Sequence, residues 1–341
     1  MPQTELPVVP LGRTGMHVTR VGFGAWALGG GGWAFAWGDQ DDRASVAAIR
    51  RALALGVNWI DTAAVYGLGH SEEVVAAALR DVPHSERPYI FTKGGNVWDP
   101  SDRARAPRRV GRPDSLRREV DGSLRRLGVE RIDLYQMHWP AEDGTPLEEY
   151  WGTLLDLRRE GKVAAVGLSN HHVEQIEAAE RVGHVDTLQP PFSMIRREAA
   201  AAELPWCAAR GTGVIVYSPM ESGLLSGTFT RERAAALGPG DWRSRSPNFH
   251  GERLERNLGL AEALRPVAAR HGVSPAAVAV AWTLSWEGTT GAIVGARSAD
   301  QVDGWIAAAR LELSEQDLDE IAAAIEWTGA GEGPVHPLRE P

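Results

Sequence analysis

Short apolar runs alternate with amphipathic segments along most of the chain. Eight runs have the length and the lack of polar alternation that are typical of buried parallel strands. They cover residues 21–25, 57–61, 89–93, 132–137, 163–169, 187–189, 214–217 and 292–294. Helical spacing follows them over residues 42–55, 71–80, 115–127, 147–160, 173–181, 199–210, 254–269, 275–285 and 299–309. The alternation predicts a parallel sheet covered by helices.

The number of strand–helix units favours a closed (β/α)₈ TIM barrel. An N-terminal β-hairpin is expected over residues 8–10 and 17–19, and extra C-terminal helices end with one over residues 315–325. A doubly wound sheet is the alternative, but it needs a glycine-rich phosphate turn directly before its first helix. The glycines at 29–32 lie in a loop rich in tryptophan instead, which we interpret as mobile.

The whole chain is interpreted as one domain with a short tail. No linker divides residues 1–327, and the Gly/Pro-rich segment 328–341 is expected to be a loosely ordered tail. The net charge of −9 provides no basic surface for nucleic acid. The single cysteine, Cys207, excludes an internal disulfide. There is no targeting segment and no membrane-length apolar run, so we expect a cytoplasmic location.

Lysine is rare in this chain. Only Lys93 and Lys162 occur, against 34 arginines. Lys93 ends a predicted strand. A lysine ammonium is compact and its pKa shifts with its surroundings, whereas an arginine guanidinium is broad and always charged, so a lysine at this position suggests a specific role. Lys162 lies in a turn at the opposite end of the predicted barrel and is interpreted as structural.

Polar residues stand at the carboxyl ends of the predicted strands, where TIM-barrel enzymes place their active sites. In chain order they are Asp61 with Tyr66, Lys93, His138, Ser169 with Asn170, Gln189, Tyr217 with Ser218, and Arg297. Each has an ordinary structural interpretation when taken alone: a strand-end aspartate is often a turn residue, and a single histidine is often a core residue. Their convergence on one rim favours a common site.

The first four ionisable groups of that set suggest proton transfer through a phenol. A free tyrosine, with a pKa of about 10, is a poor acid or base at neutral pH. A nearby ammonium favours the phenolate, whereas burial opposes it. Asp61 would hold Lys93 in place, and His138 would donate toward a substrate oxygen. No zinc-type spacing occurs around His171 and His172, and no Gly-x-Ser-x-Gly elbow occurs, so neither a metal nor a serine nucleophile is expected.

These residues lie in motifs that together resemble the aldo-keto reductase family over almost the whole chain. The motifs are Asn-Trp-Ile-Asp-Thr-Ala-Ala-Val-Tyr-Gly at 58–67, Phe-Thr-Lys at 91–93, Asp-Leu-Tyr-Gln-Met-His at 133–138, Gly-Leu-Ser-Asn at 167–170, Tyr-Ser-Pro-Met at 217–220, Gly-Leu-Leu-Ser-Gly at 223–227 and Ile-Val-Gly-Ala-Arg at 293–297. The resemblance extends to the potassium-channel β-subunits of the same family.

The resemblance implies an oxidoreductase that uses NADPH, with NADH possible, to reduce aldehydes or ketones or to catalyse the reverse oxidation. Tyr66 would be the general acid or base, supported by Lys93, Asp61 and His138. The implied cofactor-binding residues are Trp26, Asp61, Ser169, Asn170, Gln189, Tyr217, Ser218, Pro219, Met220, Gly223, Leu225, Gly295, Arg297 and Gln301. Arg297 would contact the 2′-phosphate of NADPH. The implied substrate pocket consists of Trp26, Tyr66, Trp98, His138 and Trp139.

Some positions depart from the family pattern. Gly304 and Trp305 stand where similar family members often have a glutamate and an asparagine, which weakens the adenine end of the site and its preference for NADPH over NADH. Thr228 stands where a lysine is common, which removes a phosphate contact. An NADP-binding redox-sensing module that acts through a protein partner is the alternative function. The expected partner is a small carbonyl or alcohol substrate, with no nucleic acid and no membrane. We expect a monomer or a weak homo-oligomer.

Overall fold

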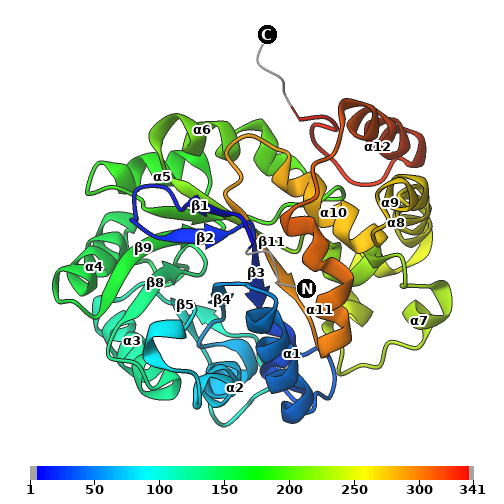
Figure 1. The fold of residues 1–341 in the computed structure, drawn as a ribbon. Helices are drawn as coiled ribbons and strands as arrows, with labels where there is room; N and C mark the ends of the chain where they lie inside the picture. The colour runs from blue at the N-terminus through cyan, green and yellow to red at the C-terminus, as the bar shows by residue number, and fades with distance from the viewer. Residues whose placement is uncertain (1–5, 338–341) are drawn as a thin grey trace.

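Eight parallel strands close into a barrel in the computed structural model, which describes residues 6–337 (Figure 1). The strands in chain order are β3 (Val21–Gly24), β4 (Trp59–Asp61), β5 (Tyr89–Gly94), β8 (Ile132–Met137), β9 (Val163–Ser169), β10 (Thr187–Gln189), β11 (Gly213–Tyr217) and β12 (Gly291–Gly295). Each strand pairs with its neighbours in the chain, and β12 closes the barrel against β3. The predicted (β/α)₈ barrel is confirmed.

Helices form a ring around this barrel (Figure 1). They are α1 (Asp42–Ala54), α2 (His70–Leu79), α3 (Pro113–Leu127), α4 (Leu147–Arg159), α5 (Val173–Glu180), α6 (Glu203–Arg210), α7 (Arg231–Ala235), α8 (Gly251–Ala263), α9 (Arg265–His271), α10 (Pro275–Leu284), α11 (Ala299–Trp305) and α12 (Glu315–Thr328). The single helix predicted over 254–269 was wrong. Two helices replace it, because Pro266 lacks an N–H donor and starts α9 in its first turn. The predicted helix over 299–309 changes to a 3₁₀ turn after Trp305.

The amino end of the barrel is closed by the predicted hairpin, β1 (Val8–Pro10) paired with β2 (His17–Thr19). Leu11, Met16 and Val18 pack into a cluster with Trp59 and other inward side chains of the barrel. The Trp59 indole donates to the Thr19 carbonyl at 2.8 Å. A methyl group on Gly22 would overlap the Trp59 ring, so a glycine is required there. With this end filled, the open end of the barrel is the carboxyl one.

Two long connections at the carboxyl end contain structure that the sequence did not predict. Within the loop after β5, β6 (Asn96–Val97) pairs antiparallel with β7 (Arg108–Arg109). The loop after β11 contains α7 and the 3₁₀ turns Glu221–Ser226, Trp242–Arg245 and Pro247–Phe249.

The described part of the C-terminal segment contacts the barrel. The Arg197 guanidinium donates to the carbonyls of Ala330 and Gly333, and Ala330 is buried. The prediction of a loosely ordered tail is therefore corrected for residues 329–337, while 338–341 lie outside the described residues. Within 6–337, no helix is long and apolar enough to cross a membrane.

Candidate active site

Tyr66 lies just beyond β4, in a turn that requires a glycine at position 67. Gly67 has a φ of 63°, and a methyl group on it would meet the Gly29 carbonyl oxygen at 2.1 Å. Gly29 is equally constrained, because a methyl group there would meet Gly67 N at 2.6 Å. This backbone contact joins the loop after β3 to the loop after β4 and fixes the position of the phenol.

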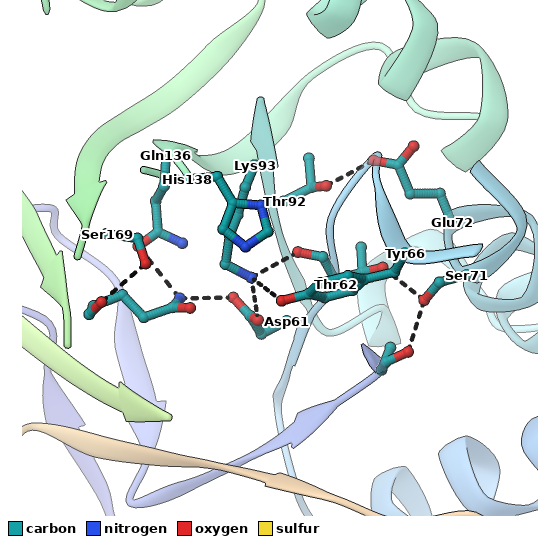
Figure 2. A network of polar contacts seen from close by, with 12 residues as sticks. Asp61, Thr62, Tyr66, Ser71, Glu72, Thr92, Lys93, Gln136, His138 and Ser169 are labelled. Carbon is teal, nitrogen blue, oxygen red and sulfur yellow. Dashed lines mark hydrogen bonds and ion pairs between the residues drawn. The ribbon is translucent and has the colours of Figure 1, made fainter. Parts of the chain in front are cut away.

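Lys93 is the centre of the buried polar network (Figure 2). Its ammonium donates to Asp61 Oδ1 at 2.5 Å, to the Thr62 carbonyl at 2.9 Å and to Tyr66 Oη at 3.4 Å. The lysine side chain is fully buried and that of Asp61 is 4% exposed. All three ammonium donors are thus used, and one of them is directed at the phenol.

Burial dominates the electrostatics of this network. It raises the pKa of Tyr66 well above the ordinary value, and the Asp61 carboxylate raises it further. Burial also lowers the pKa of Lys93 and raises that of Asp61, while the attraction between the two opposes both shifts. The sequence left open whether the nearby ammonium or burial has the larger effect on the pKa of Tyr66. In the structure, burial has the larger effect. Tyr66 is a neutral phenol that holds a proton it can donate.

His138 faces the same phenol from the end of β8. Its ring lies 5.6 Å from the Tyr66 ring, measured between centroids, in an edge-to-face arrangement. Burial, followed by the charges of Lys93 and Arg109, lowers the pKa of His138 well below its usual value. The ring is therefore neutral, and its buried Nδ1 has no hydrogen-bond partner among the described residues.

Hydrogen bonds between amides and hydroxyls continue from Asp61 around the barrel. Gln189 Nε2 donates to Asp61 Oδ2 at 2.9 Å, and the Ser169 hydroxyl donates to the Gln189 carbonyl at 2.9 Å. Asn170 donates to the His138 carbonyl, and Tyr217 Oη donates to Asn170 Oδ1 at 2.8 Å. The structure therefore brings these predicted residues together with the four ionisable groups.

Backbone strain concentrates at this end of the barrel. Positive φ angles occur at five non-glycine residues within 6–337: Leu68, Asn170, Ser218, Glu221 and Ser222. All five follow β4, β9 or β11 at the carboxyl end. Such conformations cost about 1–3 kcal/mol each and cluster at functional sites.

Tryptophans join two loops across the end of β12. We call residues 33–41, after β3, and 241–245, after β11, the strap. The Trp26 and Trp242 rings stack with centroids 5.2 Å apart, and Trp37 lies edge-on to both. The Trp242 amide donates to the Ala36 carbonyl at 2.8 Å. The loop interpreted as mobile thus has extensive packing partners.

Arg297, which follows β12, is engaged with the strap. Its guanidinium donates to Gln40 Oε1 at 2.7 Å, to the Trp37 carbonyl at 3.2 Å and to the Asp39 carbonyl. Its amide is bound by Gln301 Oε1 at 2.8 Å. Burial and the charge of Arg243 lower the pKa of Arg297. In this structure, the Arg297 guanidinium is engaged by the strap and is not free for the 2′-phosphate contact that the resemblance implied.

The remaining predicted residues are distributed over the same face. Met220 directly precedes the turn Glu221–Ser226, which contains Gly223 and Leu225, and the Leu225 side chain is fully buried. Trp26 and Trp98 pack with Tyr66 around Trp33, and Trp139 lies beneath the Arg109 guanidinium. Sequence reasoning missed Gln40, Arg109, Trp242 and Arg243. They lie in loops whose pairing has no periodic signal.

The site fits a nicotinamide dinucleotide in one respect and not in another. Among residues 6–337, His138 Nδ1, Gln136 Nε2 and the indole nitrogens of Trp37 and Trp242 are buried without partners, so these groups are available to a ligand. The adenosine end offers no free cation at Arg297. Within 6–337, no cluster of three or more His, Cys, Asp or Glu residues could hold a metal.

Comparisons with known proteins show relatives over almost the whole chain. The family model described as the aldo/keto reductase family matches residues 20–326. The chain is 35% identical to the NADH-specific methylglyoxal reductase of Escherichia coli, an alignment that covers 93% of this chain and 99% of the relative. It is 33% identical to the aldo-keto reductase YhdN of Bacillus subtilis, over 92% of each chain.

Solved structures show the same fold. A glycerol dehydrogenase from Gluconobacter oxydans superposes with a TM-score of 0.84 at 33% identity, over 100% of both chains. The holo form of an aldo-keto reductase from Bacillus halodurans gives a TM-score of 0.76 at 23% identity and covers 94% of this chain and 96% of the other. The second likeness supports the fold alone.

Proposed function

Because the chain belongs to the aldo-keto reductase family, we propose that Tyr66, Lys93, Asp61 and His138 carry out its reaction. The family makes the protein an NAD(P)H-dependent oxidoreductase that acts on small carbonyl compounds or alcohols. The observation that carries the assignment of residues is the contact of Tyr66 Oη with the buried, Asp61-paired ammonium of Lys93.

Each side chain has a separate role in this proposal. The nicotinamide, when bound, supplies the hydride for the carbonyl carbon. Tyr66 gives its proton to the carbonyl oxygen, and the Lys93 ammonium stabilises the negative charge left on the phenol. Asp61 holds Lys93 in position, and the neutral His138 orients the carbonyl oxygen by a hydrogen bond. Because burial raises the pKa of Tyr66, the free site holds the phenol in the protonated form that the reduction requires.

Cofactor preference depends on Arg297 in this proposal. NADH needs no contact from its guanidinium, whereas the 2′-phosphate of NADPH must compete with Gln40 and the strap carbonyls for it. By the family resemblance, Thr228 removes a further phosphate contact, and Gly304 and Trp305 weaken the adenine end of the site. We therefore propose that NADH is accepted, and that NADPH is used only when Arg297 exchanges these partners. The relative from E. coli is named NADH-specific, which agrees with this order.

The test is reduction of an activated aromatic aldehyde by purified protein, with NADH and NADPH measured side by side. Tyr66→Phe should remove most of the turnover, by about 10²–10⁴-fold, while dinucleotide binding measured by calorimetry persists. Tyr89→Phe is the matched control, because Tyr89 begins β5 at the other end of the barrel. Full turnover in Tyr66→Phe would refute the proposed acid.

We also propose that the protein is a monomer or a weak homo-oligomer. The alternative of a redox-sensing regulatory module has no specific observation in its favour.

A further inference from the structure

Arg109 lies in the small ribbon that directly follows the strand of Lys93. In this ribbon β7 pairs Arg109 with Asn96 and Arg108 with Val97. Neighbouring residues of a strand point to opposite faces. Arg109 is half-buried and Arg108 is exposed. The two arginines are thus neighbours on one strand and carry the same charge, but their side chains face different surroundings.

The face of Arg109 is that of the active site. Its guanidinium lies 4.3 Å from the centroid of the Trp139 ring, and Trp139 directly follows His138. The Arg109 backbone is held as well, since its carbonyl accepts from the Glu142 amide at 3.0 Å. Its charge also contributes to the lowered pKa of His138, so its field reaches the imidazole. The Arg109 cation therefore stacks on the residue that directly follows His138, which orients the carbonyl in the proposed function.

The ion-pair partner of Arg109 is an exposed carboxylate, which another anion can replace. Arg109 Nη1 contacts Glu142 Oε1 at 2.5 Å, and the Glu142 side chain is 64% exposed, against 35% for Arg109. An exposed ion pair of this kind contributes little, about 0–1 kcal/mol. Glu142 can therefore exchange the guanidinium for water at little cost, and its carboxylate marks where another oxyanion fits.

The surrounding loop is basic although the protein is acidic. Residues 99–112 contain five arginines and two aspartates, whereas the whole chain has a net charge of −9. Arg103, in the same loop, reaches the Gly67 carbonyl at 3.5 Å and so stands next to Tyr66. The positive potential is thus local to the mouth of the site, where it attracts anionic ligands.

We propose that Arg109 binds a carboxylate on the substrate, so that the preferred carbonyl compounds are anionic. The carboxylate replaces Glu142 on the guanidinium, which stays stacked on Trp139, while the carbonyl oxygen lies between Tyr66 and His138. A planar guanidinium suits a planar carboxylate. This inference rests on the proposed function, since it concerns the substrate of the same site.

The experiment compares para-formylbenzoate with its methyl ester, two aldehydes that differ chiefly in charge. The wild type should have the higher kcat/KM for the acid. Arg109→Gln should reduce kcat/KM for the acid on the order of tenfold to a hundredfold, mainly through KM, and change that for the ester at most about twofold. Arg108→Gln, the matched control, should change neither. Glu142→Gln should lower KM for the acid, because it frees Arg109.

Equal losses for acid and ester in Arg109→Gln, or the same loss in Arg108→Gln, would overturn the proposal. So would a wild type that turns over the ester and does not prefer the acid. If neither aldehyde is reduced, the proposed function fails instead. Calorimetric binding of the unreactive anion benzoate then decides separately: binding that Arg109→Gln abolishes supports the carboxylate site, and no binding refutes it. Should Arg109→Gln fail to fold, the Glu142→Gln measurement decides in its place.

Discussion

Glu72 is a buried charge next to Lys93, the lysine of the proposed catalytic set. Its carboxylate is fully buried and accepts from Thr92 Oγ1 at 2.6 Å (Figure 2). It also accepts from Arg126 Nε at 2.7 Å. Thr92 directly precedes Lys93 in β5. The charge of Glu72 also opposes the lowering of the Lys93 pKa. At the residue scale, Glu72 thus supports both the position and the charge of the lysine.

Glu72→Gln should destabilise the protein and impair the site. Removing one partner of a buried ion pair costs about 3–5 kcal/mol, and here it leaves the Arg126 cation partly buried without its counter-charge. Lys93 would lose a charge that favours its ammonium, so kcat should fall in the folded fraction. Thermal unfolding and steady-state kinetics measure the two effects.

The neighbouring Glu73→Gln is the control for this change. Its side chain is 61% exposed, and its ion pair with His70 spans 3.6 Å. The free energy of unfolding should stay within about 0.5 kcal/mol of the wild type. Equal effects of the two variants would show that the buried pair has no special role.

At the scale of elements, the strap and Arg297 connect the loops that follow three neighbouring strands, β11, β12 and β3. The barrel order places β12 between β11 and β3, and the flanking loops meet over the end of β12 through Trp26, Trp37 and Trp242. Arg297, from the loop of β12 itself, donates to the same segment. A dinucleotide along the β11 and β12 loops would therefore lie against the strap.

Trp242→Ala should weaken dinucleotide binding without preventing folding. Each aromatic pair contributes about 0.5–1.5 kcal/mol, and the change removes contacts with both Trp26 and Trp37. We expect the Kd for NADH to rise on the order of tenfold, as measured by calorimetry. Trp327→Ala, at a side chain on α12 that is 82% exposed, should leave the Kd unchanged. An unaltered Kd in Trp242→Ala would separate the strap from the cofactor.

At the scale of the whole molecule, the two ends of the barrel have different roles. The hairpin and Trp59 fill the amino end, and the ionisable groups occupy the carboxyl end. Stability and chemistry are thus separated along the barrel axis.

Leu11→Ala should lower stability and leave catalysis intact. Leu11 is fully buried in the cluster at the amino end, and such a truncation costs about 2–5 kcal/mol. The melting temperature should fall, while kcat and KM measured well below it stay unchanged. Val8→Ala in the same hairpin is the comparison, because Val8 is 51% exposed and should have little effect. A change in KM in Leu11→Ala would show that the two ends are coupled.

The sequence predicted those features that depend on local pattern. All eight strands were found because buried parallel strands are continuous apolar runs, and Asp61, Lys93 and His138 were found because a strand end sets their place. The Arg297–Gln40 contact was not predictable, since it joins residues 257 positions apart across two irregular loops. The ribbon around Arg109 was missed for a similar reason: two-residue strands have no measurable period. The protonation state of Tyr66 depends on the burial of its phenol, and burial is a property of the folded structure that the sequence pattern does not show.

The scarcity of lysine has a practical consequence for attaching the protein to a solid support. Lys93 is wholly buried, whereas the Lys162 side chain is 32% exposed and paired with Asp121 at 2.6 Å. Lys162 directly precedes β9, at the hairpin end of the barrel. An amine-reactive bead would therefore find one accessible lysine side chain, on the face away from Tyr66. Molecules captured through it would share one orientation, with their active sites turned toward the bulk solution.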